Sequence, residues 1–188
     1  MGNQPDTGGI TDMRKVVVIA KPESVALGLE AFMEDELEEL GLKIVDCRSS
    51  GQLTEDEARQ LYDELRQDGR SWYEDAVRAI LRGPVVVFLV EGGDDAVTVI
   101  KEWRGPTFDA DQTDSFRGRM IREYGTGEDE SLRAATNYVH SSGGDKEARH
   151  EAEHPLPRLS VRRLRSPHRN HKPDAVGVPI RFLGPPIF

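Results

Sequence analysis

The residue best suited to chemistry in this chain is His140, which lies within the segment 137–142 (NYVHSS) and precedes Glu151 by eleven residues. A neutral imidazole is a competent nucleophile at physiological pH, and its titration range allows it to carry a phosphoryl group. Lys21-Pro22 follow the first apolar run of the chain, where the lysine can offer a positive charge to phosphates. Together these residues predict a phosphoryl-transfer enzyme that uses a histidine as its nucleophile.

Two further groups of side chains have chemical potential. Arg117 supplies a guanidinium that can hold phosphate oxygens bidentately, which suits a reaction that depends on positioning and charge neutralisation. His150 and His154 are four residues apart, a spacing that could ligate a metal ion from one helix. Because no third ligand stands nearby, solvated helix residues are the plainer interpretation, and we assign no metal ligand from the sequence.

Composition limits the classes of function. The chain has 188 residues and a net charge of −9, but seven basic residues against one acid follow position 155. The acidic remainder disfavours nucleic-acid binding, to which the basic tail would be a local exception. A single cysteine, Cys47, allows no internal disulfide and favours a cytoplasmic location. No apolar run approaches the ~18–20 residues that a membrane span needs.

The elements that must position these side chains alternate along the chain. Runs of β-branched and apolar residues predict strands at 15–20, 42–48, 84–90 and 137–139. Helical spacing, capping residues and terminal glycines predict helices at 27–40, 54–65, 71–83, 94–103, 116–124 and 145–154. This split βαββαβ rhythm indicates an α/β (α+β) sandwich with a ferredoxin-like antiparallel sheet, rather than a doubly wound parallel sheet.

Three segments stand outside that pattern. Residues 1–13 are rich in glycine and polar residues and are expected to form a disordered leader. Residues 126–136 are polar and acidic and are expected to be an insertion within a domain that spans 14–155. Residues 156–188 are rich in proline and arginine and are expected to be an extended C-terminal segment draped over the body or over a neighbouring subunit.

A series of short motifs runs through residues 14–155. In chain order they are AKP (20–22), GPVV (83–86), EG (91–92), GPT (105–107), RG (117–118) and N-x-x-H-x-S (137–142). In this order, with this placement on strands and helices, they resemble the nucleoside diphosphate kinase family. The resemblance implies transfer of the γ-phosphate of ATP to a nucleoside diphosphate through a phosphohistidine on His140. It also implies Mg²⁺ carried by the nucleotide phosphates and a dimer-based homo-oligomer.

The resemblance assigns roles to individual residues. His140, Glu151, Lys21 and Tyr62 match the family's catalytic group, with Glu151 bonded to the ring nitrogen of His140 that does not carry phosphate. Nucleotide binding is assigned to Lys21, Trp72, Lys101, Thr107, Arg117, Asn137 and Ser142. Among these, Trp72 would stack on the base, Asn137 would contact the sugar hydroxyl, and Lys101 replaces a phosphate-binding arginine.

Departures from the family pattern leave alternatives open. Glu23-Ser24 replace the usual Asp-Gly after Lys-Pro, and Phe108-Asp109 replace the Asn-Pro expected after Thr107. Two glycines displace the acid that normally lies close to the histidine, a loss that Asp145 is expected to recover. The alternatives are a diverged kinase for one specialised nucleotide, a non-catalytic nucleotide-binding or scaffolding module of the same fold, and a nucleic-acid-binding protein that uses its basic tail.

Overall fold

The computed structural model describes residues 13–107, 113–126 and 136–153. The predicted insertion and the predicted leader lie almost wholly outside these ranges, and the predicted C-terminal segment lies wholly outside them. The domain boundaries expected from the sequence therefore stay predictions. Within the described residues, no helix is long and apolar enough to cross a membrane.

Four antiparallel strands form one sheet in the order β2-β3-β1-β4. The strands are β1 (Arg14–Ala20), β2 (Lys43–Gln52), β3 (Pro84–Gly92) and β4 (Val139–Ser141). The helices are α1 (Pro22–Leu27), α2 (Glu30–Glu39), α3 (Glu55–Leu61), α4 (Asp63–Gln67), α5 (Tyr73–Ile80), α6 (Ala96–Arg104), α7 (Phe116–Tyr124) and α8 (Asp145–Glu153). This arrangement confirms the predicted ferredoxin-like antiparallel sheet, with β1 and β3 in its centre.

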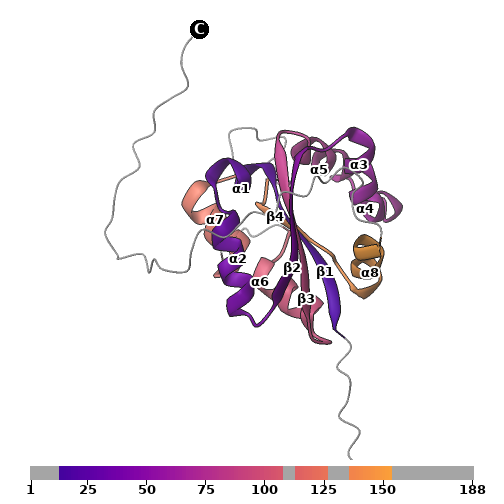
Figure 1. Cartoon of the computed structure of the whole chain (residues 1–188). Helices are drawn as coiled ribbons and strands as arrows, with labels where there is room; N and C mark the ends of the chain where they lie inside the picture. The colour runs from indigo at the N-terminus through magenta and orange to yellow at the C-terminus, as the bar shows by residue number, and fades with distance from the viewer. Residues whose placement is uncertain (1–12, 108–112, 127–135, 154–188) are drawn as a thin grey trace, which may run out of the picture.

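The sheet separates two apolar cores. Along β1, Val16 and Val18 pack into one core, while Val17 and Ile19 pack into the other, as the two-residue period of a strand requires. Figure 1 shows α2, α6 and α7 on one side of the sheet and α3, α4 and α5 on the other. Because both faces of the central strands are covered, β1 and β3 are continuously apolar.

The predicted helix at 27–40 is wrong in its first turns. Pro22 starts a separate helix, α1, which Gly28 ends with a left-handed φ of 68° before α2 begins. The break divides the predicted apolar stripe: Leu29, Met33 and Leu37 are buried, whereas Leu27, Phe32 and Leu40 are each more than 40% exposed. The predicted stop at Gly41 is confirmed, since its φ is 78° just after α2.

Two other predicted boundaries need correction. Thr54 does cap a helix, but the predicted helix divides at Tyr62 into α3 and α4. Ser71 is not a cap, because α5 begins after Trp72 and has no side-chain cap bond. The last strand begins two residues later than predicted, so His140 lies within β4 rather than after it.

Candidate active site

Pairing of β1 with β4 brings the two ends of the domain together. Ala20 pairs with Val139 and Ile19 pairs with His140. The residues that follow β1 therefore lie beside the residues that precede β4. The backbone N–H of Lys21 donates to the carbonyl of Tyr138 at 3.0 Å. The Nζ of Lys21 then reaches the Oδ1 of Asn137 at 2.9 Å, and both side chains are buried.

The turn before β4 is strained and firmly held. Tyr138 has a φ of 67°, a region that a residue with a bulky side chain seldom adopts. The carboxylate of Glu23 accepts from its N–H at 2.8 Å, the hydroxyl of Ser24 donates to its carbonyl at 2.7 Å, and its own hydroxyl donates to the carbonyl of Gly125 at 2.5 Å. The unusual Glu23-Ser24 pair therefore fixes the turn that presents Asn137 and His140.

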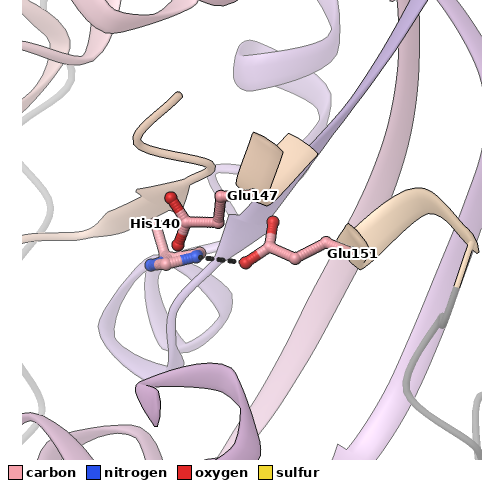
Figure 2. Close-up of side chains that lie close together, drawn as sticks. All are labelled: His140, Glu147 and Glu151. Carbon is pink, nitrogen blue, oxygen red and sulfur yellow. Dashed lines mark hydrogen bonds and ion pairs between the residues drawn. The ribbon is translucent and has the colours of Figure 1, made fainter. Parts of the chain in front are cut away.

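His140 is held from its Nε2 side. Its Nε2 lies 3.3 Å from Oε1 of Glu151 (Figure 2). The other oxygen of Glu151 accepts a hydrogen bond of 2.6 Å from the hydroxyl of Ser142. Neutral His140 with its proton on Nε2 can donate to Glu151, which leaves the lone pair on Nδ1. The edge of the Tyr62 ring meets the imidazole at a centroid distance of 5.5 Å and an angle of 86°.

The electrostatics keep His140 neutral. Its burial lowers the pKa of the imidazole, with smaller contributions from Arg104 and Lys21, although Glu151 opposes the shift. A neutral histidine is the form that can act as a nucleophile. Burial also raises the pKa of Tyr62, whose hydroxyl has no hydrogen-bond partner among the described residues.

Most of the predicted residues line one cavity of about 190 Å³. Its lining contains Lys21, Tyr62, Trp72, Thr107, Arg117, Asn137 and His140, together with Arg104 and Glu147. These side chains come from both ends of the domain and from both sides of the sheet edge at β4. The cavity therefore combines a nucleophile, cations, an amide and an aromatic side chain.

Three cations gather at this cavity. Burial, with smaller contributions from the positive charges of Arg117 and Arg104, lowers the pKa of Lys21 to about 8, while Glu23 opposes the shift. Such mutual repulsion is relieved when a polyanion binds between the cations. The three cations thus form a site that favours phosphate groups.

Arg117 also has a structural task. Its Nε and Nη2 donate to the carbonyl of Val139 at 3.3 and 2.6 Å, and its Nη1 donates to the carbonyl of Gly105 at 3.3 Å. These bonds tie α7 to the start of β4 and to the loop after α6. Part of the guanidinium fork that the sequence assigned to phosphate is therefore used to hold backbone in place.

Arg104 is the functional residue that the sequence did not single out. Its Nη1 donates to the carbonyl of Ser141 at 2.8 Å, and its Nε is buried without a partner among the described residues. The predicted Lys101 is exposed and is absent from the described cavity lining. The helix α6 therefore presents its last residue to the cavity; the only sequence signal was a cation directly before Gly105.

Other predicted residues take varied places. Trp72 lines the cavity while packing against the core beneath α5, and Thr107 accepts a bond of 3.3 Å from Asn137 through its carbonyl. Ser142 is completely buried, is absent from the described cavity lining and donates to Glu151, while its predicted contact with nucleotide stays a prediction. The hydroxyl of Ser142 is fully engaged by that carboxylate.

Besides Glu151, the acid that lies near His140 is Glu147 and not Asp145. Asp145 forms an ion pair of 2.6 Å with Arg14 at the other end of β1, so the expected recovery by Asp145 is wrong. Glu147 lines the cavity and accepts a hydrogen bond from the N–H of Gly143. A Cβ at position 143 would lie 2.8 Å from Oε2 of Glu147, so this carboxylate fills space that the glycine leaves. Burial and the neighbouring Glu151 raise its pKa to about 7.

Comparison with known proteins identifies the family of this chain. The family model described as nucleoside diphosphate kinase matches residues 14–159. A nucleoside diphosphate kinase of Saccharolobus islandicus is 32% identical over 139 residues, which cover 74% of this chain and 91% of that protein. One from Hydrogenovibrio crunogenus is 28% identical over 149 residues, covering 79% of this chain and 96% of the relative.

Solved structures show the same fold. The Aquifex aeolicus nucleoside diphosphate kinase superposes with a TM-score of 0.61 at 24% identity, covering 74% of this chain and 92% of that one. A Borrelia burgdorferi nucleoside-diphosphate kinase, described as a transition state mimic with bound vanadate and ADP, gives 0.60 at 22%, covering 80% and 93%. The predicted fold and the predicted class of kinase are confirmed, and this chain belongs to the nucleoside diphosphate kinase family.

Proposed function

We propose that this protein transfers the γ-phosphate of ATP to a nucleoside diphosphate through a phosphohistidine on His140. The observation that carries the proposal is the pairing of His140 Nε2 with Glu151 at 3.3 Å, in a cavity that three cations also line. The nucleophile and the charges that would hold its substrate thus share one site.

The transfer takes two displacements. In the first, the lone pair on Nδ1 of His140 attacks the γ-phosphorus, the bond from that phosphorus to its bridging oxygen breaks, and the nucleoside diphosphate leaves. Glu151 stabilises the positive charge that develops on the imidazole. In the second, a terminal phosphate oxygen of a new diphosphate attacks the same phosphorus, the N–P bond breaks, and neutral His140 returns.

The remaining residues bind and position. Lys21, Arg104 and Arg117 neutralise the phosphates, Asn137 contacts the sugar, and Trp72 offers a ring on which the base stacks. Lys21 and Asn137 are already joined at 2.9 Å, so the phosphate and sugar contacts are prearranged. Thr107 borders the phosphate side of the cavity and, through its carbonyl, helps to orient Asn137.

Mg²⁺ is expected to arrive with the nucleotide. The exposed acids Glu64 and Asp68 border the cavity, which suits a hydrated Mg²⁺ carried on phosphates rather than one held in a cage of protein ligands. When bound, the ion supplies further neutralisation of the phosphate charge.

The cellular location and the partners of the protein are inferred from its cysteine usage, its exposed apolar side chains and the charge of its tail. Cys47 is a free cysteine and the single cysteine of the chain, which supports a reduced, cytoplasmic protein. Exposed apolar side chains along α2 and the open edge of β2 support a homo-oligomer. Nucleic-acid binding would depend on the basic tail, which lies outside the described residues.

The decisive test is a covalent labelling experiment. Purified protein is incubated with Mg²⁺ and γ-labelled ATP, and His140→Ala is treated in parallel. We expect acid-labile, base-stable label on the wild type alone, discharged by nucleoside diphosphates. ATP binding without any label would contradict the enzyme and leave a nucleotide-binding module. A panel of diphosphates then separates a general kinase from one for a specialised nucleotide.

A further inference from the structure

The nucleophile His140 and two nearby carboxylates form a set of metal ligands that the proposed reaction does not use as such. One ligand atom from each of His140, Glu147 and Glu151 lies within 4.8 Å of the others. The close-up shows these three side chains close together (Figure 2). His140 is buried, and both carboxylates are half-buried. We propose that these three residues bind a zinc-like divalent cation, and that the bound ion switches off the nucleophile.

The distances suit such an ion. Two ligands bound tetrahedrally at about 2.1 Å from zinc lie roughly 3.4 Å apart. Nε2 of His140 and Oε1 of Glu151 are already 3.3 Å apart, with only 12% of either side chain exposed. The third ligand needs only a small side-chain movement, because Glu147 lies one turn before Glu151 on the same face of α8.

Each carboxylate keeps an oxygen for the ion. Oε2 of Glu151 accepts from the hydroxyl of Ser142, which leaves Oε1 facing His140. Oε2 of Glu147 accepts from the N–H of Gly143, and no described residue donates to its Oε1. These supporting bonds are of the kind that orients metal ligands in known sites.

The donor set decides the class of ion. One imidazole nitrogen with two carboxylate oxygens favours Zn²⁺, Co²⁺ or Ni²⁺ over Mg²⁺, which prefers oxygen ligands and retains its water. The site is therefore separate in chemistry from the Mg²⁺ that travels with the nucleotide. His140 and Glu147 line the cavity, so a hydrated ion can reach them by the nucleotide's path.

The consequence for His140 follows from the chemistry of imidazole. A neutral ring has one nitrogen with a lone pair and one with a proton. When an ion takes the lone pair of Nε2, the proton moves to Nδ1, and Nδ1 no longer has an electron pair with which to attack phosphorus. Glu151 in the metal-free site holds the opposite tautomer. Only this inhibition rests on the proposed function; the binding of the ion does not.

The test is a titration of metal-free full-length protein with Co²⁺, followed by its visible absorption and then by displacement with Zn²⁺. We expect a saturable Co²⁺ spectrum in the wild type. Its loss is expected in His140→Gln, and in Glu147→Gln the affinity should fall by at least about tenfold, the loss that changes to outer partners of metal ligands already cause. Circular dichroism confirms that each variant is folded.

A matched control lies on the same helix. His150→Gln removes the histidine of α8, which is not among the proposed ligands, and should leave the spectrum unchanged. Equal Co²⁺ affinity in wild type and Glu147→Gln, or loss of the spectrum in His150→Gln, would overturn the site. In a second arm, Zn²⁺ at a concentration that displaces Co²⁺ should block labelling of His140 despite excess Mg²⁺; full labelling of the Zn²⁺-loaded protein would overturn the switch. A protein that binds Co²⁺ but never labels would contradict the proposed function alone.

Discussion

At the scale of single residues, the site depends on keeping one base neutral and several cations charged within a small volume. Burial lowers the pKa of His140 and the pKa of Lys21, so it favours the neutral form of both side chains. The neutral form of His140 is the one that can act as a nucleophile, whereas the charged form of Lys21 is stabilised when an anion binds beside it. Burial of the site therefore suits both His140 as the reacting group and Lys21 as a binding group for phosphate.

The pH profile should show the titration of Lys21. Its pKa of about 8 means that the ammonium is charged below that pH and loses its charge as the pH rises through it. Because kcat/KM reports the free enzyme, kcat/KM for ATP should fall above about pH 8. In Lys21→Arg the cation does not titrate, so the decline should move to higher pH. Steady-state kinetics from pH 6 to about 10 measure this, and identical alkaline limbs in both proteins would contradict it.

Arg104, rather than Lys101, should hold the phosphates. Charged hydrogen bonds are worth about 1.5–3 kcal/mol, so Arg104→Ala should weaken ATP binding by roughly 10–100-fold. Lys101→Ala, a charge change on the same helix, should have little effect because its side chain is exposed and outside the cavity lining. Calorimetric titration with a non-hydrolysable ATP analogue measures both. A larger loss for Lys101→Ala would restore the interpretation drawn from the sequence.

At the scale of elements, short helices and one strained turn carry the site. The helix α3 begins at a capping box, in which the hydroxyl of Thr54 accepts from the N–H of Glu57 while the carboxylate of Glu57 accepts from the N–H of Thr54. That helix ends at Tyr62, whose ring packs on His140. Helix capping thus fixes one wall of the cavity.

The capping box makes a testable contribution to stability. Thr54→Ala removes the acceptor for the N–H of Glu57 and should lower the free energy of unfolding by about 1 kcal/mol, within a range of 0.5–2. Thr54→Ser keeps the acceptor and should retain most of the stability. Urea unfolding followed by circular dichroism measures the change. Equal loss in both variants would show that the methyl group, and not the cap, is responsible.

At the scale of the whole molecule, we expect the proposed second copy at the β2 edge of the sheet. β2 forms one edge of the sheet, and its Val45 is 38% exposed at an irregularity between Ile44 and Asp46. An apolar side chain on an open edge strand favours association between chains. The exposed Leu40 at the end of α2 adds to this surface.

The proposed homo-oligomer can be tested at that edge. Val45→Lys places a charge of the kind that keeps edge strands apart, and it should shift the protein toward monomer at concentrations where the wild type is assembled. Sedimentation velocity measures the distribution. Lys15→Gln, a charge change on the central strand β1, serves as the control and should leave the distribution unchanged. An assembled Val45→Lys protein would exclude this edge as the interface.

Particular elements show how much of the structure can be predicted from the sequence. The apolar runs of β1 and β3 and the motif around His140 were sufficient to predict the antiparallel sheet and the family. The two-residue period of a strand and the order of the motifs can be read directly from one sequence, because they depend only on which residues stand at which positions. The helix at 27–40 failed because Gly28 ends one helix within an otherwise helical pattern.

What the sequence by itself determined was the chemistry: a histidine with a carboxylate partner, the cations Lys21 and Arg117, and the sheet that carries them. Only the tertiary structure decided that Arg104 and Glu147, rather than Lys101 and Asp145, line the cavity, and that Ser142 supports Glu151. The reason is physical. The direction in which a side chain points at a helix end or a turn depends on how strands and helices pack, and that packing joins residues more than a hundred positions apart, such as Lys21 and Asn137.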